Sequence, residues 1–256
     1  MKKAFALLYG VLCYSIFFGT FLYAAGFLVN FGVPRSIDSA PTGSTMAAIV
    51  VDVLLLGLFA VQHSVMARPW FKRAWTRFVP EHLERSTYVL FSSVALLVLF
   101  WKWQPIGGVI WSLEGTPALF AYGMFAVGLL IVLLSTFLIN HFDLFGLRQV
   151  YLYALGRKYT HLEFRTPFFY RYVRHPLYVG WVLSFWSTPV MTAAHLLFAL
   201  VTTAYMLSAI RWEERDLIAV HGDKYRRYRK TVPMMIPALP SGASAETAPK
   251  RVAAAN

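Results

Sequence analysis

Long runs of apolar residues dominate the pattern along this chain. Residues 4–34, 115–142 and 175–210 contain no Asp, Glu, Lys or Arg. One helical crossing of the hydrocarbon layer of a membrane needs about 20 such residues. Each run is long enough for at least one crossing, so the pattern predicts an integral membrane protein built of helices.

Two further apolar segments extend the predicted bundle. Residues 46–66 follow the sequence 42–45, whose Ser and Thr are typical of a helix N-cap. A shorter segment, 87–103, ends in tryptophans, which favour the membrane interface. Together the segments predict an all-α bundle of five to six transmembrane helices.

The run 175–210 is far longer than one crossing requires. Pro189 and Thr192 lie near its middle, so we expect a C-terminal helical hairpin with arms at about 177–190 and 193–212. The first arm is short. The sequence therefore leaves open whether this arm spans the membrane or re-enters it.

Composition excludes several other classes of protein. The chain has 256 residues, of which 58% are apolar and 14% charged, and its mean hydropathy is +0.54. A soluble doubly wound enzyme does not need so apolar a sequence. The single cysteine, Cys13, excludes a disulfide scaffold and a Cys-x-x-Cys site.

The net charge of +12 would suggest a nucleic-acid partner in a soluble protein, but membrane topology explains it here. Of the 24 basic residues, 22 fall in segments that share one side of the predicted bundle, and only Arg35 and Lys102 fall on the other. Basic residues accumulate in cytoplasmic loops. We therefore expect a multi-pass protein of the bacterial inner membrane with both termini in the cytoplasm, and no nucleic-acid partner.

Polar side chains gather at the predicted cytoplasmic ends of four segments. Such groups are costly in a bilayer and usually face the protein interior or a water-filled cavity. The pattern predicts a site at this end, open to the cytoplasm on one side and to the membrane on the other. The segments concerned are Gln62-His63-Ser64, Asn140-His141-Phe142-Asp143, Arg174-His175 and Glu213-Glu214.

The histidines in this set also have plainer interpretations. His63 and His141 could simply hydrogen-bond the end of a neighbouring helix. His63, His141 and His175 could together hold a metal, but no two of them have the close helical spacing of a typical ligand pair. We therefore expect no metal site.

A short cytoplasmic amphipathic helix is expected after Gly222, a residue typical of a helix end. Tyr225 and Tyr228 are three residues apart and share one face of it, while the arginines and Lys230 point elsewhere. Taken alone, this pattern also fits a helix lying on anionic lipid. Residues 232–237 predict an extended apolar strap, and the Ala-, Ser- and Pro-rich residues 238–256 predict a disordered tail.

The C-terminal third of the chain resembles the isoprenylcysteine carboxyl methyltransferase and phospholipid methyltransferase superfamily of integral membrane enzymes. The resemblance covers about 65 residues, and the order of its elements is more specific than any one of them. The elements are Arg174-His175-Pro176-x-Tyr178-x-Gly180, about thirty residues of paired apolar helix, Glu213-Glu214-x-x-Leu217, Gly222-x-x-Tyr225-x-x-Tyr228 and Val232-Pro233-x-x-Ile236-Pro237.

This resemblance implies S-adenosylmethionine as the cofactor and a cofactor-binding core over residues 141–237, after a four-helix membrane region at 1–140. It implies that Glu213 and Glu214 receive the ammonium or ribose hydroxyls, and that Arg211 or Arg174 binds the carboxylate by a bidentate contact. The remaining cofactor-binding residues that it implies are His175, Pro176, Tyr178, Gly180, Tyr225 and Tyr228, with Gly180 allowing close approach of the ligand.

The rest of the chain resembles one branch, the bacterial methanethiol S-methyltransferases and their NnrU-like relatives. Gln62-His63-Ser64 and the residues 140–149, Asn-His-Phe-Asp-Leu-Phe-Gly-Leu-Arg-Gln, carry this likeness. It implies methylation of a small lipid-soluble thiol, methanethiol to dimethyl sulfide. No residue resembles a covalent nucleophile with a partner base, so we expect direct in-line transfer, at the cytoplasmic membrane interface that the polar segments predict.

An alkyl thiol is a weak acid, so its methylation needs a general base or cationic neighbours. His141 and His63 are candidates for the base, with Tyr178 and Arg211 as further catalytic candidates. The resemblance leaves other acceptors open, a prenylcysteine carboxylate or a phospholipid amine. A haem-binding isomerase of the NnrU-like type, with His63 and His141 as axial ligands, is a further alternative.

Overall fold

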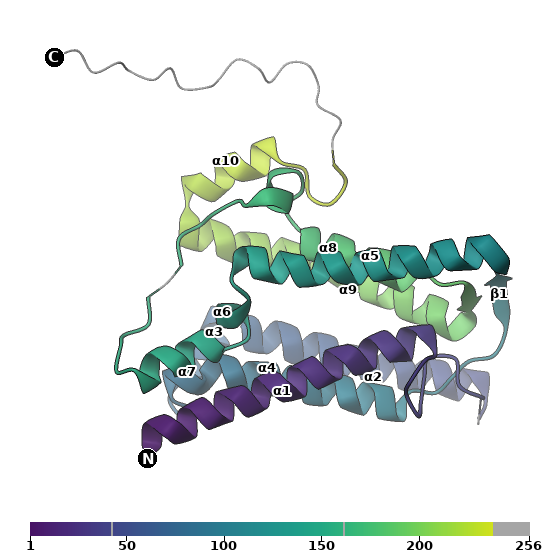
Figure 1. The fold of residues 1–256 in the computed structure, drawn as a ribbon, viewed down its shortest axis with the longest axis horizontal. Coiled ribbons are helices and arrows are strands. Elements are labelled where there is room, and N and C mark those ends of the chain that lie inside the picture. Colours follow the sequence, from purple (N-terminus) through teal and green to yellow (C-terminus); the bar gives the residue numbers. More distant parts are fainter. Residues whose placement is uncertain (42, 161, 238–256) are drawn as a thin grey trace, which may run out of the picture.

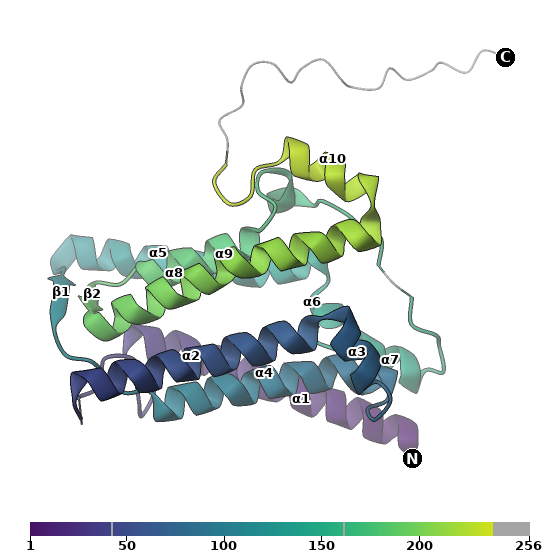
Figure 2. The same cartoon turned by 180° about the vertical axis from the view of Figure 1, so that it is seen from behind.

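The computed structural model describes residues 1–41, 43–160 and 162–237, and its long helices form two layers. Figure 1 and the reverse view in Figure 2 show the same division. The first layer contains α1 (Lys2–Val29), α2 (Thr45–Ala67) and α4 (Glu81–Lys102). The second layer contains α5 (Gly115–Ile139), α8 (Pro176–Trp186) and α9 (Ala193–His221).

Shorter elements lie at the two ends of these layers. Near one end β1 (Val109–Ser112) pairs antiparallel with β2 (Val190–Thr192), with Val109 opposite Thr192, and so ties the segment before α5 to the turn of the hairpin. The other end carries most of the remaining elements: α3 (Pro69–Trp75), α6 (His141–Leu144), α7 (Leu147–Ala154), the 3-10 helix η1 (Phe168–Arg171) and α10 (Asp223–Thr231).

Five of the long helices, all except α8, are long and apolar enough to cross a membrane. The prediction of an all-α, multi-pass membrane protein is thereby confirmed. The first arm of the hairpin, α8, has 11 residues. At 1.5 Å per residue it extends about 16 Å, roughly half of the hydrocarbon thickness. It is therefore too short to span and enters the bundle from one side.

Two predicted boundaries differ from the structure. The third segment begins at Glu81 rather than residue 87, because Pro80 precedes a first turn of charged residues that lies beyond the apolar stretch. The first arm of the hairpin ends at Trp186 rather than at residue 190. The last helix continues to His221, and Gly222, with a φ of 56°, ends it as predicted. The predicted disordered tail, 238–256, lies outside the described residues.

The contact between α5 and α8 depends on two glycines. A Cβ atom on Gly128 would lie 2.7 Å from the carbonyl oxygen of Gly180, and one on Gly180 would lie 2.7 Å from that of Gly128. Hydrogen in place of a side chain therefore lets the two backbones touch. The predicted site residue Gly180 faces the backbone of α5, and its small size serves helix packing.

The interface between the layers changes character along its length. Toward the β1–β2 end it is aromatic, with the ring centroids of Trp103 and Phe198 5.8 Å apart and those of Phe27 and Phe198 6.5 Å apart. Toward the other end the contacts become polar: Ser64 of α2 hydrogen-bonds Tyr205 of α9 at 2.9 Å, and Arg68 pairs with Asp216 at 2.8 Å. The polar end carries the predicted site.

Candidate active site

The start of α8 and the last turns of α9 bring two motifs together that lie about 40 residues apart in sequence. Pro176 occupies the first turn of α8, where its missing N–H costs nothing, and His175 is the cap residue before it. Arg174 and His175 then face Glu214 of α9. The predicted common level of Arg174-His175 and Glu213-Glu214 corresponds to this arrangement.

Glu214 is a buried carboxylate that is already paired with cationic and polar side chains of the protein. Its Oε1 accepts from Arg174 Nε at 2.7 Å and from His175 Nε2 at 3.2 Å. Its Oε2 lies 3.6 Å from Arg229 Nε. The side chains of Arg174, His175 and Glu214 are only 10%, 4% and 9% exposed. This triad holds the entry of α8 against α9.

Glu213 differs from its neighbour in that 44% of its side chain is exposed. Its Oε2 accepts a hydrogen bond from the Tyr178 hydroxyl at 2.9 Å. Within the described chain, no hydrogen bond reaches the Oε1 atom of Glu213. This carboxylate therefore has an open oxygen that a bound cation or hydroxyl could use.

A lid, formed by α10 and the strap 232–237, covers this cluster. Arg174 N and His175 N donate to the carbonyl oxygens of Pro233 and Met234 at 2.9 and 3.1 Å. The predicted strap thus pairs with the backbone of the motif that it covers. Arg174 also donates to the Arg229 carbonyl oxygen at 3.0 Å, which joins α10 to the same site.

Tyr225 and Tyr228 form the inner face of the lid, as the spacing predicted. Both are buried, with ring centroids 5.7 Å apart. The Tyr228 hydroxyl donates to the carbonyl oxygen of Tyr170 at 2.6 Å. Burial raises the pKa of Tyr228 to about 12, and burial together with Glu214 raises the pKa of Tyr225. Both phenols therefore stay protonated at neutral pH.

His63 lies in a second polar group, between the layers. The Tyr88 hydroxyl is 3.0 and 3.1 Å from its two ring nitrogens, and Ser92 Oγ is 3.2 Å from Nδ1. The ring of Phe59 stacks on His63 and also contacts Tyr205. Both Tyr88 and Tyr205 are close enough to interact electrostatically with Tyr178. Tyr88 therefore lies near both His63 and Tyr178.

The sequence analysis missed Tyr88 and Tyr205. Each lies within an apolar helix, and no short motif marks them. The signal that could have found them is the presence of a hydroxyl in a membrane-spanning segment, since such groups usually face a polar interior.

His141 lies at the same end of the bundle but has different partners. The Thr136 hydroxyl donates to the Leu133 carbonyl oxygen at 2.6 Å, so it must accept from His141 Nδ1, which is 2.8 Å away. The Nε2 atom then accepts from the Tyr14 hydroxyl at 2.8 Å. Burial lowers the pKa of His141. The neutral His141 ring therefore joins α6 to α1, and its basic nitrogen already accepts the hydrogen bond from Tyr14.

Arg211, predicted as a catalytic or carboxylate-binding residue, is not brought into the cluster. It is exposed on α9 and forms none of the ion pairs found among the described residues. Arg174, the alternative candidate, is engaged by Glu214 and by the lid.

The haem alternative, and the histidine metal site that the sequence analysis considered, find no support in the positions of these rings. In residues 1–41, 43–160 and 162–237, no group of three His, Cys, Asp or Glu side chains could hold a metal ion. His63 and His141 each have both ring nitrogens within hydrogen-bond distance of protein hydroxyls. Neither ring offers a free nitrogen for an axial bond.

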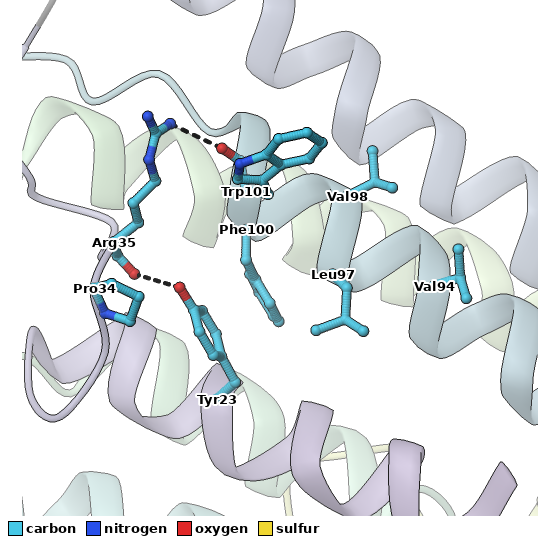
Figure 3. Close-up of a pocket in the computed structure, with 8 residues that line it drawn as sticks. All are labelled: Tyr23, Pro34, Arg35, Val94, Leu97, Val98, Phe100 and Trp101. Atoms are coloured by element: carbon cyan, nitrogen blue, oxygen red, sulfur yellow. Dashed lines mark hydrogen bonds between the residues drawn. The ribbon is translucent and has the colours of Figure 1, made fainter. Parts of the chain in front are cut away.

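Two surface hollows lie at the opposite end from this cluster. One, of about 560 Å³, is almost wholly apolar and runs between α1 and α4. Figure 3 shows Tyr23, Leu97 and Trp101 lining it, with Arg35 donating to the Trp101 carbonyl oxygen. The other, of about 290 Å³, lies beside β1. Neither hollow is lined by a titratable side chain that belongs to the cluster, so neither could take part in proton transfer there.

Comparison with known proteins gives consistent matches. The family model described as phospholipid methyltransferase matches residues 117–224. The methanethiol S-methyltransferase of Crocosphaera subtropica is 59% identical over 238 residues, which cover 93% of each chain. That of Mycobacterium tuberculosis is 52% identical over 240 residues, covering 93% of this chain and 98% of its own.

A more distant relative has another name. Nurim of Mus musculus is 32% identical over 184 residues, which cover 68% of this chain and 70% of its own. No solved structure matches this chain.

Proposed function

This chain belongs to the methanethiol S-methyltransferase family and is a methyltransferase, and from that premise we propose that it transfers a methyl group from S-adenosylmethionine to methanethiol, forming dimethyl sulfide. The observation that carries the proposal is the convergence of Tyr178, Glu213, Tyr225 and Tyr228 at one end of the bundle. Sequence relationship indicates a methyl donor, and the chemistry of these side chains supports S-adenosylmethionine as that donor.

The residues fit the groups that such a donor carries. The open Oε1 of Glu213 suits an ammonium group or a ribose hydroxyl. The rings of Tyr225 and Tyr228 on the inner face of the lid suit a sulfonium cation, because aromatic faces attract positive charge. Glu214 is already paired with Arg174 and His175, so it acts as a positioning residue that holds the site in shape.

When bound, S-adenosylmethionine supplies a methyl group on a positively charged sulfur. The protein then has to exclude water, orient the thiol and remove its proton. Transfer cancels a positive and a negative charge, so a site of low polarity favours it, an effect whose energetic interpretation is debated. Ser92 Oγ lies beside His63, and Cys13 is buried in α1, but a thiolate can attack a sulfonium methyl group without first passing it to a protein nucleophile. Direct transfer to the thiol follows.

His63 is the general base that the contacts favour. It lies between the two layers, where the Tyr88 hydroxyl is within hydrogen-bond distance of its ring and the ring of Phe59 contacts both His63 and Tyr205 of α9. A small lipid-soluble thiol could reach this region from the membrane. His141 is less suited to the role, because its hydrogen-bond partners, Tyr14 and Thr136, lie apart from Tyr88 and the Tyr178–Glu213 pair.

The site faces the cytoplasm of a bacterial cell in this proposal. The cations follow the positive-inside pattern, and Arg35 and Lys102 lie at the end of the bundle that is opposite the lid. This orientation lets a water-soluble cofactor enter beneath the lid, while the thiol arrives from the membrane.

The test is an acceptor panel with purified enzyme. We expect dimethyl sulfide from S-adenosylmethionine and methanethiol, and no methylation of a prenylcysteine or of phosphatidylethanolamine. Methyl transfer only to one of the last two acceptors would overturn the assignment of the thiol. A strong Soret band in the purified protein would instead support the haem-binding alternative.

A further inference from the structure

The lid helix α10 has two faces of different chemistry. Its inner face is Tyr225 and Tyr228, both buried. Its outer face is basic, with a single acid, Asp223, which pairs with Arg226 at 2.8 Å. The exposed cations of this face are Lys224, Arg226, Arg227, Arg229 and Lys230.

Exposed apolar side chains lie beside this basic face. Phe168 and Tyr172, in and next to η1, are 61% and 62% exposed, and Ile236 in the strap is 83% exposed. The bond from Tyr228 to the Tyr170 carbonyl oxygen joins η1 to α10. Figure 1 shows η1, the strap and α10 gathered at one place. The exposed basic and apolar residues therefore lie on adjoining elements, and together we call them the lid surface.

We propose that this surface docks on anionic phospholipids of the cytoplasmic leaflet, and that docking stabilises the lid over the cofactor site. Clustered Lys and Arg residues are attracted to anionic lipid headgroups, and adjacent aromatic and aliphatic side chains insert at the boundary with the acyl chains. The inference rests on the proposed function for its second part only. The docking itself depends on the charge and exposure of this surface.

The lid is joined directly to the site, so docking has a route to the cofactor. The strap pairs with Arg174 and His175, and α10 binds Arg174 through the Arg229 carbonyl oxygen. A water-soluble cofactor must pass beneath these contacts. If anionic lipid binds the closed lid better than the open lid, it shifts the population toward the closed form and tightens cofactor binding.

The experiment compares nanodiscs of phosphatidylcholine with nanodiscs that contain 30% phosphatidylglycerol. The titrant is S-adenosylhomocysteine, whose net charge is zero, because a cationic ligand would accumulate at an anionic surface without any lid. We expect affinity about fivefold tighter in the anionic nanodiscs, comparable with the effect of one surface cation. Hydrogen exchange of the α10 amides should slow in the same nanodiscs.

The variant Lys224→Gln, Arg227→Gln, Lys230→Gln should bind equally in both nanodiscs and lose the slowed exchange. A matched control, Lys2→Gln, Arg73→Gln, Arg77→Gln, removes three exposed cations from α1, α3 and the turn after α3 and should keep the difference. Equal affinity and equal exchange for the wild type in both nanodiscs would overturn the inference. Slowed exchange without any binding of S-adenosylhomocysteine would support the docking and overturn the proposed function instead.

Discussion

Adjacent carboxylates in α9 should respond differently to the same substitution. Glu214→Gln removes the negative charge that pairs with Arg174 and His175. The side chains of these three residues are at most 10% exposed. Glu213→Gln removes a charge from a side chain that is 44% exposed, and its amide oxygen still accepts from Tyr178. We therefore expect a loss of stability from the first variant and a loss of cofactor affinity from the second.

The magnitudes follow from burial. Breaking a buried ion pair costs about 3–5 kcal/mol, and we expect about 3 kcal/mol for Glu214→Gln because one acceptor remains. In a chain of this size that corresponds to a melting temperature lower by roughly 6–12 °C. Glu213→Gln should change stability by about 1 kcal/mol at most. Loss of a charged hydrogen bond worth about 1.5–3 kcal/mol weakens binding roughly 10- to 150-fold.

The assay is thermal unfolding, followed by tryptophan fluorescence, together with calorimetric titration of S-adenosylhomocysteine. Glu163→Gln is the matched control, since that side chain is 81% exposed and its nearest cation is 3.9 Å away. It should change neither quantity. The reasoning is refuted if Glu213→Gln binds with wild-type affinity, or if Glu214→Gln melts at the wild-type temperature.

Three further predictions follow from contacts elsewhere in the bundle. Gly180→Ala should lower the free energy of unfolding by about 1–3 kcal/mol, because the added Cβ would overlap the α5 backbone. Gly123 has open space around it, so Gly123→Ala should leave stability unchanged. Thermal unfolding of the two variants measures the difference. His63→Gln should lower kcat for methanethiol at least tenfold. Tyr14→Phe, which frees the His141 nitrogen, should leave kcat within about twofold of the wild-type value. Single-turnover assays of both variants test this. Folding lowers the pKa of His141 below its ordinary value of 6.5, so the neutral ring contributes stability above pH 6.5. Stability should therefore fall as the pH drops below 6.5. It should fall less steeply in His141→Gln, which lacks the titrating ring.

The sequence predicted the membrane fold well because its main determinant is local. Uninterrupted apolar runs such as 115–142 specify spanning helices almost without reference to the rest of the chain. Helix ends were less predictable. The start of α4 at Glu81 lies among charged residues outside the membrane, where hydropathy carries no signal.

The candidate site could be predicted only as far as neighbouring residues in motifs indicated it. The common level of Arg174 and Glu214 was expected from the hairpin, since its two arms must return to one level, but their direct ion pair was not. The different burial of Glu213 and Glu214 depends on packing against the lid, which no sequence pattern encodes. Gly180 likewise packs against Gly128 of α5, a partner 52 positions away that spacing within one motif does not reveal.

The most direct test of the central claim is photo-crosslinking of the purified enzyme with an azidoadenosine analogue of S-adenosylmethionine, followed by peptide mapping. The account predicts label within residues 164–178 or 213–228, and loss of that label when excess S-adenosylhomocysteine is present. Label confined to residues 94–101, in the apolar hollow at the opposite end of the bundle, would contradict it.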